Sequence, residues 1–214
     1  MPYSLMLAIS SSVMGTDLYI AGMPQMVEQL SCTTQKVQWT ITSSVIGGSI
    51  GTLFVGPISD FYGRYKLLIL MQCLAGLAAI ACGFATVVET VIGMRFLYGF
   101  MGAGANVITF AMLSETFERR RAATYMAYMT SMITFSLIIA PFLGGMIIKI
   151  YNWRGCFFIL GLLNILTGLG VYMTSFETLK ERKTFHLISV FKNYRKVLSD
   201  SIYLRLSLIP AFMM

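Results

Sequence analysis

Six long runs of apolar residues, separated by short polar segments, divide the chain. Each run has about 20 residues or more, and a helix of that length spans about 30 Å of hydrocarbon. A seventh apolar run begins at residue 202 and ends at residue 214, which is too short to span. We therefore predict an all-α membrane protein with transmembrane helices at residues 3–22, 37–58, 67–88, 91–114, 122–148 and 155–176.

The composition agrees with this prediction and excludes several other classes of protein. Of the 214 residues, 57% are hydrophobic and 12% are charged, whereas soluble domains have about 25% charged residues. The mean hydropathy is +0.74. A disordered chain, a nucleic-acid-binding arm and a disulfide-rich secreted module are excluded. The expected partner is the lipid bilayer, and no nucleic acid is expected.

The net charge of +7 comes from lysines and arginines in the segments between the apolar runs. The positive-inside rule assigns the side with more of them to the cytoplasm. One side has eleven (64, 66, 119–121, 180, 182, 183, 192, 195, 196) and the other three (36, 149, 154). We expect an inner (plasma) membrane location with the N-terminus and the segment 177–201 in the cytoplasm. Trp39 and Trp153 are expected in the aromatic belt of the outer interface.

No enzyme-like or metal-binding motif is present in the sequence. The four cysteines fit no metal or redox spacing, and a disulfide between Cys32 and Cys156 is the open alternative to apolar filler. There is no phosphate loop and no nucleophile elbow. We expect no enzyme activity, no metal and no cofactor.

Two segments allow two interpretations each. Residues 185–198 place apolar and basic residues on different faces of a helix, which predicts an amphipathic surface helix, with an unstructured basic linker as the alternative. Gly47 and Gly51 form a GxxxG pair. Such pairs let helices pack closely in lipid, and the alternative is that they let helices slide past each other.

The segment between the second and third predicted helices carries the most specific motif. Gly56, Asp60, Gly63 and Arg64 are spaced as in the signature loop of the major facilitator superfamily, which this segment resembles. Two positions depart from that pattern, because Phe61 and Tyr65 stand where basic residues are common. The resemblance implies that the loop is a conformational latch, and the alternative is a simple loop anchored by positive charge.

Further motifs are similar to those of drug:proton antiporters of the bicyclomycin/chloramphenicol-resistance type. The end of the first helix, residues 16–24, resembles a D-x-Y-x-P-x-x-P sequence with alanine at its first proline. Arg95 followed by closely spaced glycines resembles a proton-transfer helix. Pro141, Gly144 and Gly145 match the antiporter motif, and 153–154 and 177–179 also fit this subfamily.

Asp17 and Arg95 are charged residues within predicted helices, where an ionisable side chain is costly and is by default a functional candidate. We expect them to approach one another near the outer part of a cavity, with protonation of Asp17 releasing the pair. The alternative is that each side chain reaches toward the outer headgroups. Tyr19 and Asn106 are the candidates for substrate binding.

The resemblance implies one six-helix half of a major facilitator fold, built from two inverted three-helix repeats. Residues 1–176 would form the transporter bundle, 177–201 the central loop and 202–214 the truncated start of a seventh helix. The implied function is export of small hydrophobic or amphipathic compounds, driven by the proton gradient. The alternative is a truncated, non-transporting fragment, or a subunit that needs a separately encoded second half.

Overall fold

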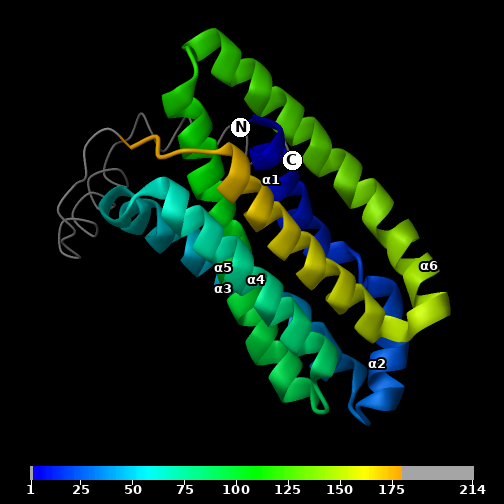
Figure 1. Cartoon of the computed structure of the whole chain (residues 1–214). Coiled ribbons are helices and arrows are strands. Elements are labelled where there is room, and N and C mark those ends of the chain that lie inside the picture. Colours follow the sequence, from blue (N-terminus) through cyan, green and yellow to red (C-terminus); the bar gives the residue numbers. More distant parts are fainter. Residues whose placement is uncertain (1, 180–214) are drawn as a thin grey trace, which may run out of the picture. The chain divides into compact units, whose positions relative to one another are not determined.

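A computed structural model describes residues 2–179, so the predictions for 185–198 and 202–214 lie outside the described residues. The described residues belong to one compact unit, Met1–Arg182. Every regular element in this part of the chain is a helix (Figure 1): α1 (Pro2–Asp17), η1 (Ile20–Gly22), α2 (Met23–Gln29), α3 (Thr34–Tyr62), α4 (Arg64–Phe84), α5 (Val88–Thr116) and α6 (Arg119–Thr174).

Five helical segments are long and apolar enough to cross a membrane. They are Tyr3–Gln29, Thr34–Tyr62, Arg64–Phe84, Val88–Thr116 and Arg119–Thr174. The first joins α1, η1 and α2, and the last is the whole of α6. The fold class is thus confirmed as an all-helical membrane protein.

The first segment is broken after Asp17, where a short 3₁₀ turn separates α1 from α2. Pro24 lies in the first turn of α2. Proline has no N–H to donate to a carbonyl of the preceding turn, so it starts a helix more readily than it continues one. The prediction of one helix over residues 3–22 was wrong at its end, because the helix breaks after Asp17 and a separate helix, α2, continues the membrane segment to Gln29.

Specific caps set the ends of α3. The side chain of Thr33 accepts a hydrogen bond from the backbone N–H of Lys36 (3.3 Å), which begins the helix. Gly63 ends it with φ +100°, a conformation that L side chains rarely adopt. The next helix, α4, begins immediately afterwards at Arg64, so a single residue makes this turn.

The chain reverses direction within α6, as Figure 1 shows. The reversal is at Asn152, whose backbone has φ 63° and ψ −177°. Its side chain Oδ1 accepts a hydrogen bond from the backbone N–H of Arg154 (2.8 Å), in the manner of a helix N-cap. The two arms of α6, residues 119–151 and 153–174, correspond to the separate helices predicted at 122–148 and 155–176.

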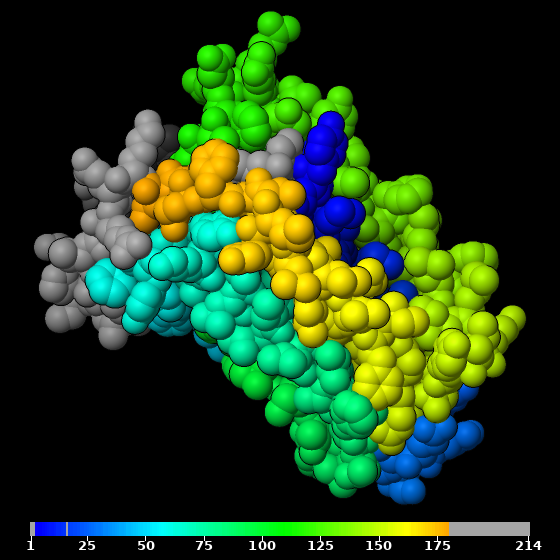
Figure 2. Space-filling model, viewed as in Figure 1, coloured from blue at the N-terminus to red at the C-terminus, as the bar shows by residue number. Residues whose placement is uncertain are grey.

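Glycines allow the helices to pack closely, and the Gly47–Gly51 pair does so between α3 and α5. A methyl group on Gly47 or Gly51 of α3 would overlap the backbone carbonyl of Phe96 or Phe100 of α5. Likewise, Gly76 of α4 and the second arm of α6 approach each other at the backbone. Figure 2 shows this second arm, in yellow and orange, lying along α4.

The helix ends gather at two opposite ends of the bundle (Figure 1). At one end, Ser4 of α1 hydrogen-bonds Thr174 of α6 (2.7 Å). At the other end, Arg154 donates to the carbonyls of Gly83 (2.8 Å) and Ala85 (2.6 Å), where α4 finishes.

The two tryptophans differ in their exposure at this second end. Trp39 is 50% exposed. The prediction that Trp153 belongs to an interfacial belt was wrong, because it is fully buried and its Nε1 donates to Gln29 Oε1 (2.9 Å).

Candidate functional site

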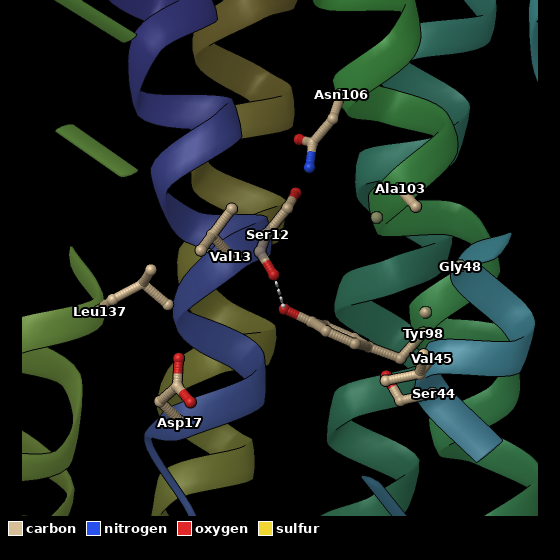
Figure 3. Close-up of a pocket in the computed structure, with 12 residues that line it drawn as sticks. Ser12, Val13, Asp17, Ser44, Val45, Gly48, Tyr98, Ala103, Asn106 and Leu137 are labelled. Atoms are coloured by element: carbon tan, nitrogen blue, oxygen red, sulfur yellow. Dashed lines mark hydrogen bonds between the residues drawn. The ribbon is translucent and has the colours of Figure 1, made fainter. Parts of the chain in front are cut away.

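A cavity of about 300 Å³ lies between α1, α3, α5 and the first arm of α6. Its walls combine small residues with a few polar side chains. Figure 3 shows Asp17 and Asn106 towards opposite ends of the cavity, with Ser12 and Tyr98 between them. Leu137 is the part of α6 that closes one side.

Asp17 is the acidic residue of this cavity. It is the last residue of α1, at the break in the first membrane segment. Its Oδ2 atom is buried and has no hydrogen-bond partner within the part of the chain that the structure describes. A carboxylate oxygen without a partner can accept a proton or a donor group of a bound molecule.

Arg95 lies next to the same break but faces the backbone of α1. Its side chain is 1% exposed, and Nη1 donates to the carbonyl oxygen of Gly15 (2.7 Å). The Cζ atom lies 4.6 Å from the ring centroid of Tyr19 and 5.2 Å from that of Tyr98. The guanidinium thus binds a carbonyl near the C-terminal end of α1, where cations are favoured.

The expected pairing of Asp17 with Arg95 is met only in part. Both residues lie at the break in the first membrane segment, but no ion pair joins them in residues 2–179. Arg95 Nη1 donates to the Gly15 carbonyl instead. Arg95 also does not reach toward the outer headgroups, because its side chain is enclosed by the bundle.

The two candidates for substrate binding occupy different environments. Asn106 lines the cavity, and its Oδ1 atom is buried with no partner among the described residues. Tyr19 is fully buried outside the cavity walls, with its hydroxyl 2.9 Å from Thr40 Oγ1 and its ring against Phe157. Asn106 is therefore placed to meet a bound molecule, whereas Tyr19 supports Arg95.

Four polar residues in or next to the cavity were not singled out from the sequence. Tyr98 donates to the carbonyl of Ser12 (3.1 Å), and the Ser12 hydroxyl donates to Gln72 Oε1 (3.2 Å). Gln72 in turn donates to the carbonyl of Ala8 (2.8 Å). Asn164 is also fully buried. A lone amide inside an apolar run was the signal that could have identified Gln72 and Asn164.

The antiporter motif lies in the first arm of α6, beside the break in the first segment. A methyl group on Gly144 would overlap the carbonyl of Leu18, directly after Asp17. A methyl group on Gly145 would meet nothing within 4 Å. Pro141 lies one turn earlier, inside the helix. Gly144 therefore holds α6 close to the residues that position Asp17.

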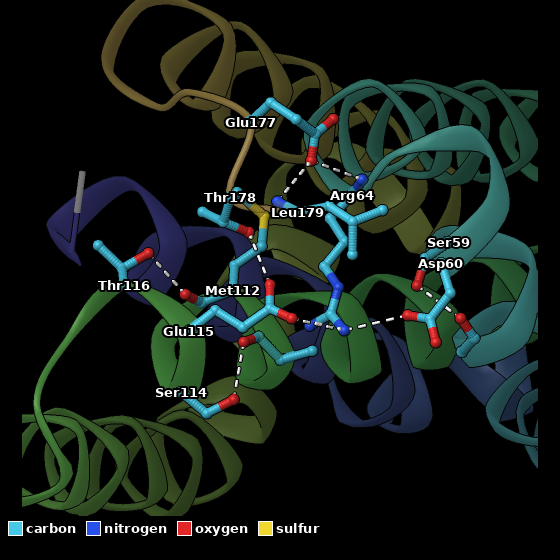
Figure 4. Close-up of polar contacts among 12 residues, drawn as sticks. Ser59, Asp60, Arg64, Met112, Ser114, Glu115, Thr116, Glu177, Thr178 and Leu179 are labelled. Carbon is cyan, nitrogen blue, oxygen red and sulfur yellow. Dashed lines mark hydrogen bonds and ion pairs between the residues drawn. The ribbon is translucent and has the colours of Figure 1, made fainter. Parts of the chain in front are cut away.

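The signature-loop residues form a polar cluster at the opposite end of the bundle from Asn152 (Figure 4). Arg64 Nη2 contacts Asp60 Oδ1 (3.0 Å) and Glu115 Oε1 (2.9 Å), which links the α3–α4 turn to the end of α5. Glu115 also accepts from the Thr178 hydroxyl (3.0 Å). Gly56 lies apart from this cluster, with Val107 3.8 Å from the position of an added methyl.

Glu177 closes the cluster from the segment after α6. Its Oε1 accepts from the backbone N–H of Arg64 (3.0 Å) and of Leu179 (3.2 Å). A side chain on Gly63 would overlap the Glu177 carboxylate. Glycine at this position therefore serves both the turn and the docking of the carboxylate at the N-terminus of α4, where anions are favoured.

The family profile "Major Facilitator Superfamily" matches residues 5–214 of this chain. The chain belongs to the major facilitator superfamily. Members of this family are membrane transporters and not enzymes. The resemblance stated from the loop and helix motifs is thus confirmed.

Curated relatives agree with the drug-antiporter motifs. The chain is 28% identical over 173 residues to a bicyclomycin resistance protein homolog of Haemophilus influenzae, covering 81% of this chain and 44% of that protein. It is 25% identical over 155 residues to the multidrug resistance protein MdtL of Salmonella paratyphi A, covering 72% and 39%. The chain therefore spans less than half the length of these relatives.

Solved structures with the same fold include a bacterial homolog of the human lysosomal transporter Spinster. Its inward-facing, unoccupied structure has a TM-score of 0.76 at 15% identity, covering 97% of this chain and 50% of that one. Its inward-facing, occupied structure has a TM-score of 0.73 at 14% identity, covering 83% and 44%. At these identities the similarity concerns the fold alone.

Proposed function

We propose that this chain forms the first six-crossing unit of a proton-coupled exporter. In this proposal α6 crosses the membrane twice, because the chain reverses at Asn152 and each arm has enough residues to span a bilayer of about 30 Å. The N-terminus is then cytoplasmic, on the side of Arg64, Lys66 and residues 119–121.

Two inverted three-helix repeats are supported by matching glycine contacts. Gly47 in the second crossing packs on the carbonyl of Phe96 in the fourth, and Gly144 in the fifth packs on that of Leu18 in the first. A two-fold rotation that replaces the first crossing by the fourth and the second by the fifth would convert one of these contacts into the other. Gly76 and Gly161, in the third and sixth, each face the other's carbonyl, as expected beside a pseudo-two-fold axis.

The observation that carries the transport proposal is the unpaired carboxylate oxygen of Asp17 in the cavity. A charged side chain inside a membrane costs about 2.5–3.5 kcal/mol or more and is normally retained for function. Proton uptake on this carboxylate would remove its charge while a substrate is absent. Proton release would restore an anionic group when a substrate enters.

Arg95 has a positioning role in this proposal. It binds the Gly15 carbonyl and so holds the end of α1 that carries Asp17. The Asp60–Arg64–Glu115 cluster would tie α3, α4 and α5 at the cytoplasmic end during alternating access. The unit tied in this way would rock as one body against a second unit.

The substrate class follows from the relatives and from the cavity. Bicyclomycin and multidrug resistance proteins are among the relatives, and the cavity combines Val13, Val45 and Leu137 with Asp17 and Asn106. This lining suits small amphipathic or hydrophobic compounds that carry a few polar groups. The proton gradient supplies the energy, and no cofactor is needed.

A second unit is part of the proposal, because the chain covers under half of its relatives. The exposed apolar side chains of α3 and of the first arm of α6, among them Val45, Leu53, Ile138 and Phe142, lie on the helices that flank the cavity. The alternative is a chain that does not transport, or a subunit that works only with a separately encoded half. Expression with and without a complementary half in an efflux-deficient host separates them by the drug tolerance measured.

Replacing Asp17 tests the proposal directly. In a transporter that joins residues 1–214 to a second six-crossing unit, Asp17→Asn keeps the side-chain size and removes the titratable group. We expect pH-dependent export of a fluorescent amphipathic drug to fall to the level of empty cells. Glu28→Gln is the matched control, because Glu28 is an exposed carboxylate of the same membrane segment. Undiminished, pH-dependent export by Asp17→Asn would contradict the proposal.

A further inference from the structure

A second concave site lies at the start of α6, away from the cavity that Asp17 lines. It is a groove of about 620 Å³ between Tyr3 and Met6 of α1 and the first arm of α6. Met6 and Met129 belong to one buried cluster, against which Tyr125 packs, so the two helices are in contact beneath the groove. Tyr3, Tyr128 and Phe135 are 77%, 58% and 64% exposed.

The α6 wall of the groove continues towards the helix start as one face. Arg121, Tyr125, Tyr128, Met132 and Phe135 are spaced alternately four and three residues apart. Residues at this spacing lie above one another on a single face of a helix. The face therefore has a cationic head followed by about three turns of aromatic and apolar side chains.

The helix start is strongly cationic and uncapped. Its first turn contains Arg119, Arg120 and Arg121, all exposed, and no acidic residue. Their backbone N–H groups precede the first intrahelical bond, from Ala122 to Glu118. Glu118 offsets one of the three charges, but its side chain makes no capping hydrogen bond.

Three arginines at a helix N-terminus oppose the helix dipole, which favours an anion there. Within residues 2–179 none of the three forms an ion pair. Glu115, the neighbouring carboxylate, is already engaged by Arg64 and Thr178. The helix start thus has the free N–H groups and guanidinium groups that a phosphate requires.

We propose that this site binds an anionic phospholipid, with its phosphate on residues 119–121 and an acyl chain in the aromatic groove. The charge complementarity selects a lipid with a net negative headgroup, and the groove selects a chain rather than a soluble phosphate. In the proposed orientation the site lies in the cytoplasmic leaflet, where juxtamembrane arginines attract anionic lipids.

The first test measures lipid binding to the purified chain by native mass spectrometry. Phosphatidylglycerol and phosphatidylcholine with the same acyl chains are titrated in separate experiments. We expect phosphatidylglycerol to bind at least about five-fold more tightly, and Arg121→Gln to weaken it about five-fold. Changing all three arginines to Gln should abolish the preference. Lys66→Gln, an exposed cation at the same end of the bundle, should leave it unchanged.

The second test fills the groove. Ser131 lines the groove, whereas its exposed neighbour Thr130 does not, and each hydroxyl donates to the carbonyl four residues earlier (3.0 Å in both). Ser131→Phe should therefore weaken binding of both lipids, and Thr130→Phe should not. Equal effects of the two variants would overturn the groove as the acyl-chain site.

Other outcomes also overturn the proposal. The unmodified chain would then show no preference for phosphatidylglycerol, or Lys66→Gln would lose the preference as much as Arg121→Gln does. Full displacement of the lipid by glycerol phosphate would identify a soluble phosphate as the occupant. Loss of the preference once a second six-crossing unit is attached would show that this unit covers the groove. Binding in detergent depends neither on transport nor on membrane orientation, so this proposal and the transport proposal fail independently.

Discussion

At the scale of single residues, Asp17 and Arg95 lie together at a break in the first membrane segment and face different partners. The guanidinium of Arg95 satisfies a backbone carbonyl near the end of α1, while the carboxylate of Asp17 faces the cavity. A break in a membrane helix exposes polar backbone groups that need partners. A positive charge held beside this break stabilises it and leaves Asp17 available for a proton.

Gly144 and Gly145 provide a matched pair for testing the contact that holds this break. Gly144→Ala would place a methyl group against the Leu18 carbonyl, whereas Gly145→Ala meets nothing within 4 Å. We expect Gly144→Ala to destabilise the unit by about 1–3 kcal/mol. Gly145→Ala should be neutral or stabilising by up to about 1 kcal/mol, because alanine favours helices. Thermal unfolding in detergent measures both, and a similar loss for the two variants would contradict the assigned contact.

The positions of these charged residues inside membrane segments were predictable from the sequence, but their contacts were not. Asp17 and Arg95 were identified because ionisable groups in apolar runs are rare. Their side chains lie at the break after Asp17, where Pro24 begins a new helix and Gly144 packs against Leu18. These features place the two charges beside each other without a direct ion pair. The different environments of Tyr19 and Asn106 were not predictable, because the sequence does not show which face of the broken segment turns toward the cavity.

At the scale of elements, the apolar runs predicted where helices occur better than where they end. The helix predicted at 67–88 begins at Arg64 and ends at Phe84, and the next begins at Val88 rather than 91. Hydropathy records the part of a helix that meets lipid, whereas caps such as Gly63 and Asn152 set its ends. Such caps act through backbone conformation, which an apolar pattern does not encode.

The reversal within α6 depends on Asn152, which combines a left-handed backbone with a capping side chain. Asn152→Asp retains the acceptor oxygen and tolerates this conformation, so we expect stability within about 0.5 kcal/mol of the parent. Asn152→Val loses the cap and forces a branched residue into the left-handed region, which should cost about 2–3 kcal/mol. The midpoint of thermal unfolding in detergent reports the difference. Equal midpoints for the two variants would show that the turn is set by packing instead.

At the scale of the whole molecule, the unequal burial of the helices is consistent with the proposal that a second six-crossing unit packs against this one. In the most apolar stretch of each membrane segment, the share of residues that are buried is 56% for α4, 28% for α3 and 17% for α6. Both poorly buried helices contribute walls to the cavity. A second unit that covers these faces would therefore also close the cavity.

The proposed six crossings can be tested by labelling single cysteines in a variant whose four natural cysteines are replaced. Lys36→Cys and Tyr151→Cys lie at the end of the bundle that contains Asn152, and Lys66→Cys, Arg120→Cys and Phe176→Cys lie at the other. A membrane-impermeant maleimide added to intact cells should label the first two at once. The other three should react only after permeabilisation, because α6 leaves and re-enters the cytoplasmic side. Labelling of Phe176→Cys but not Arg120→Cys from outside would mean that α6 crosses once, and the six-crossing proposal would fail.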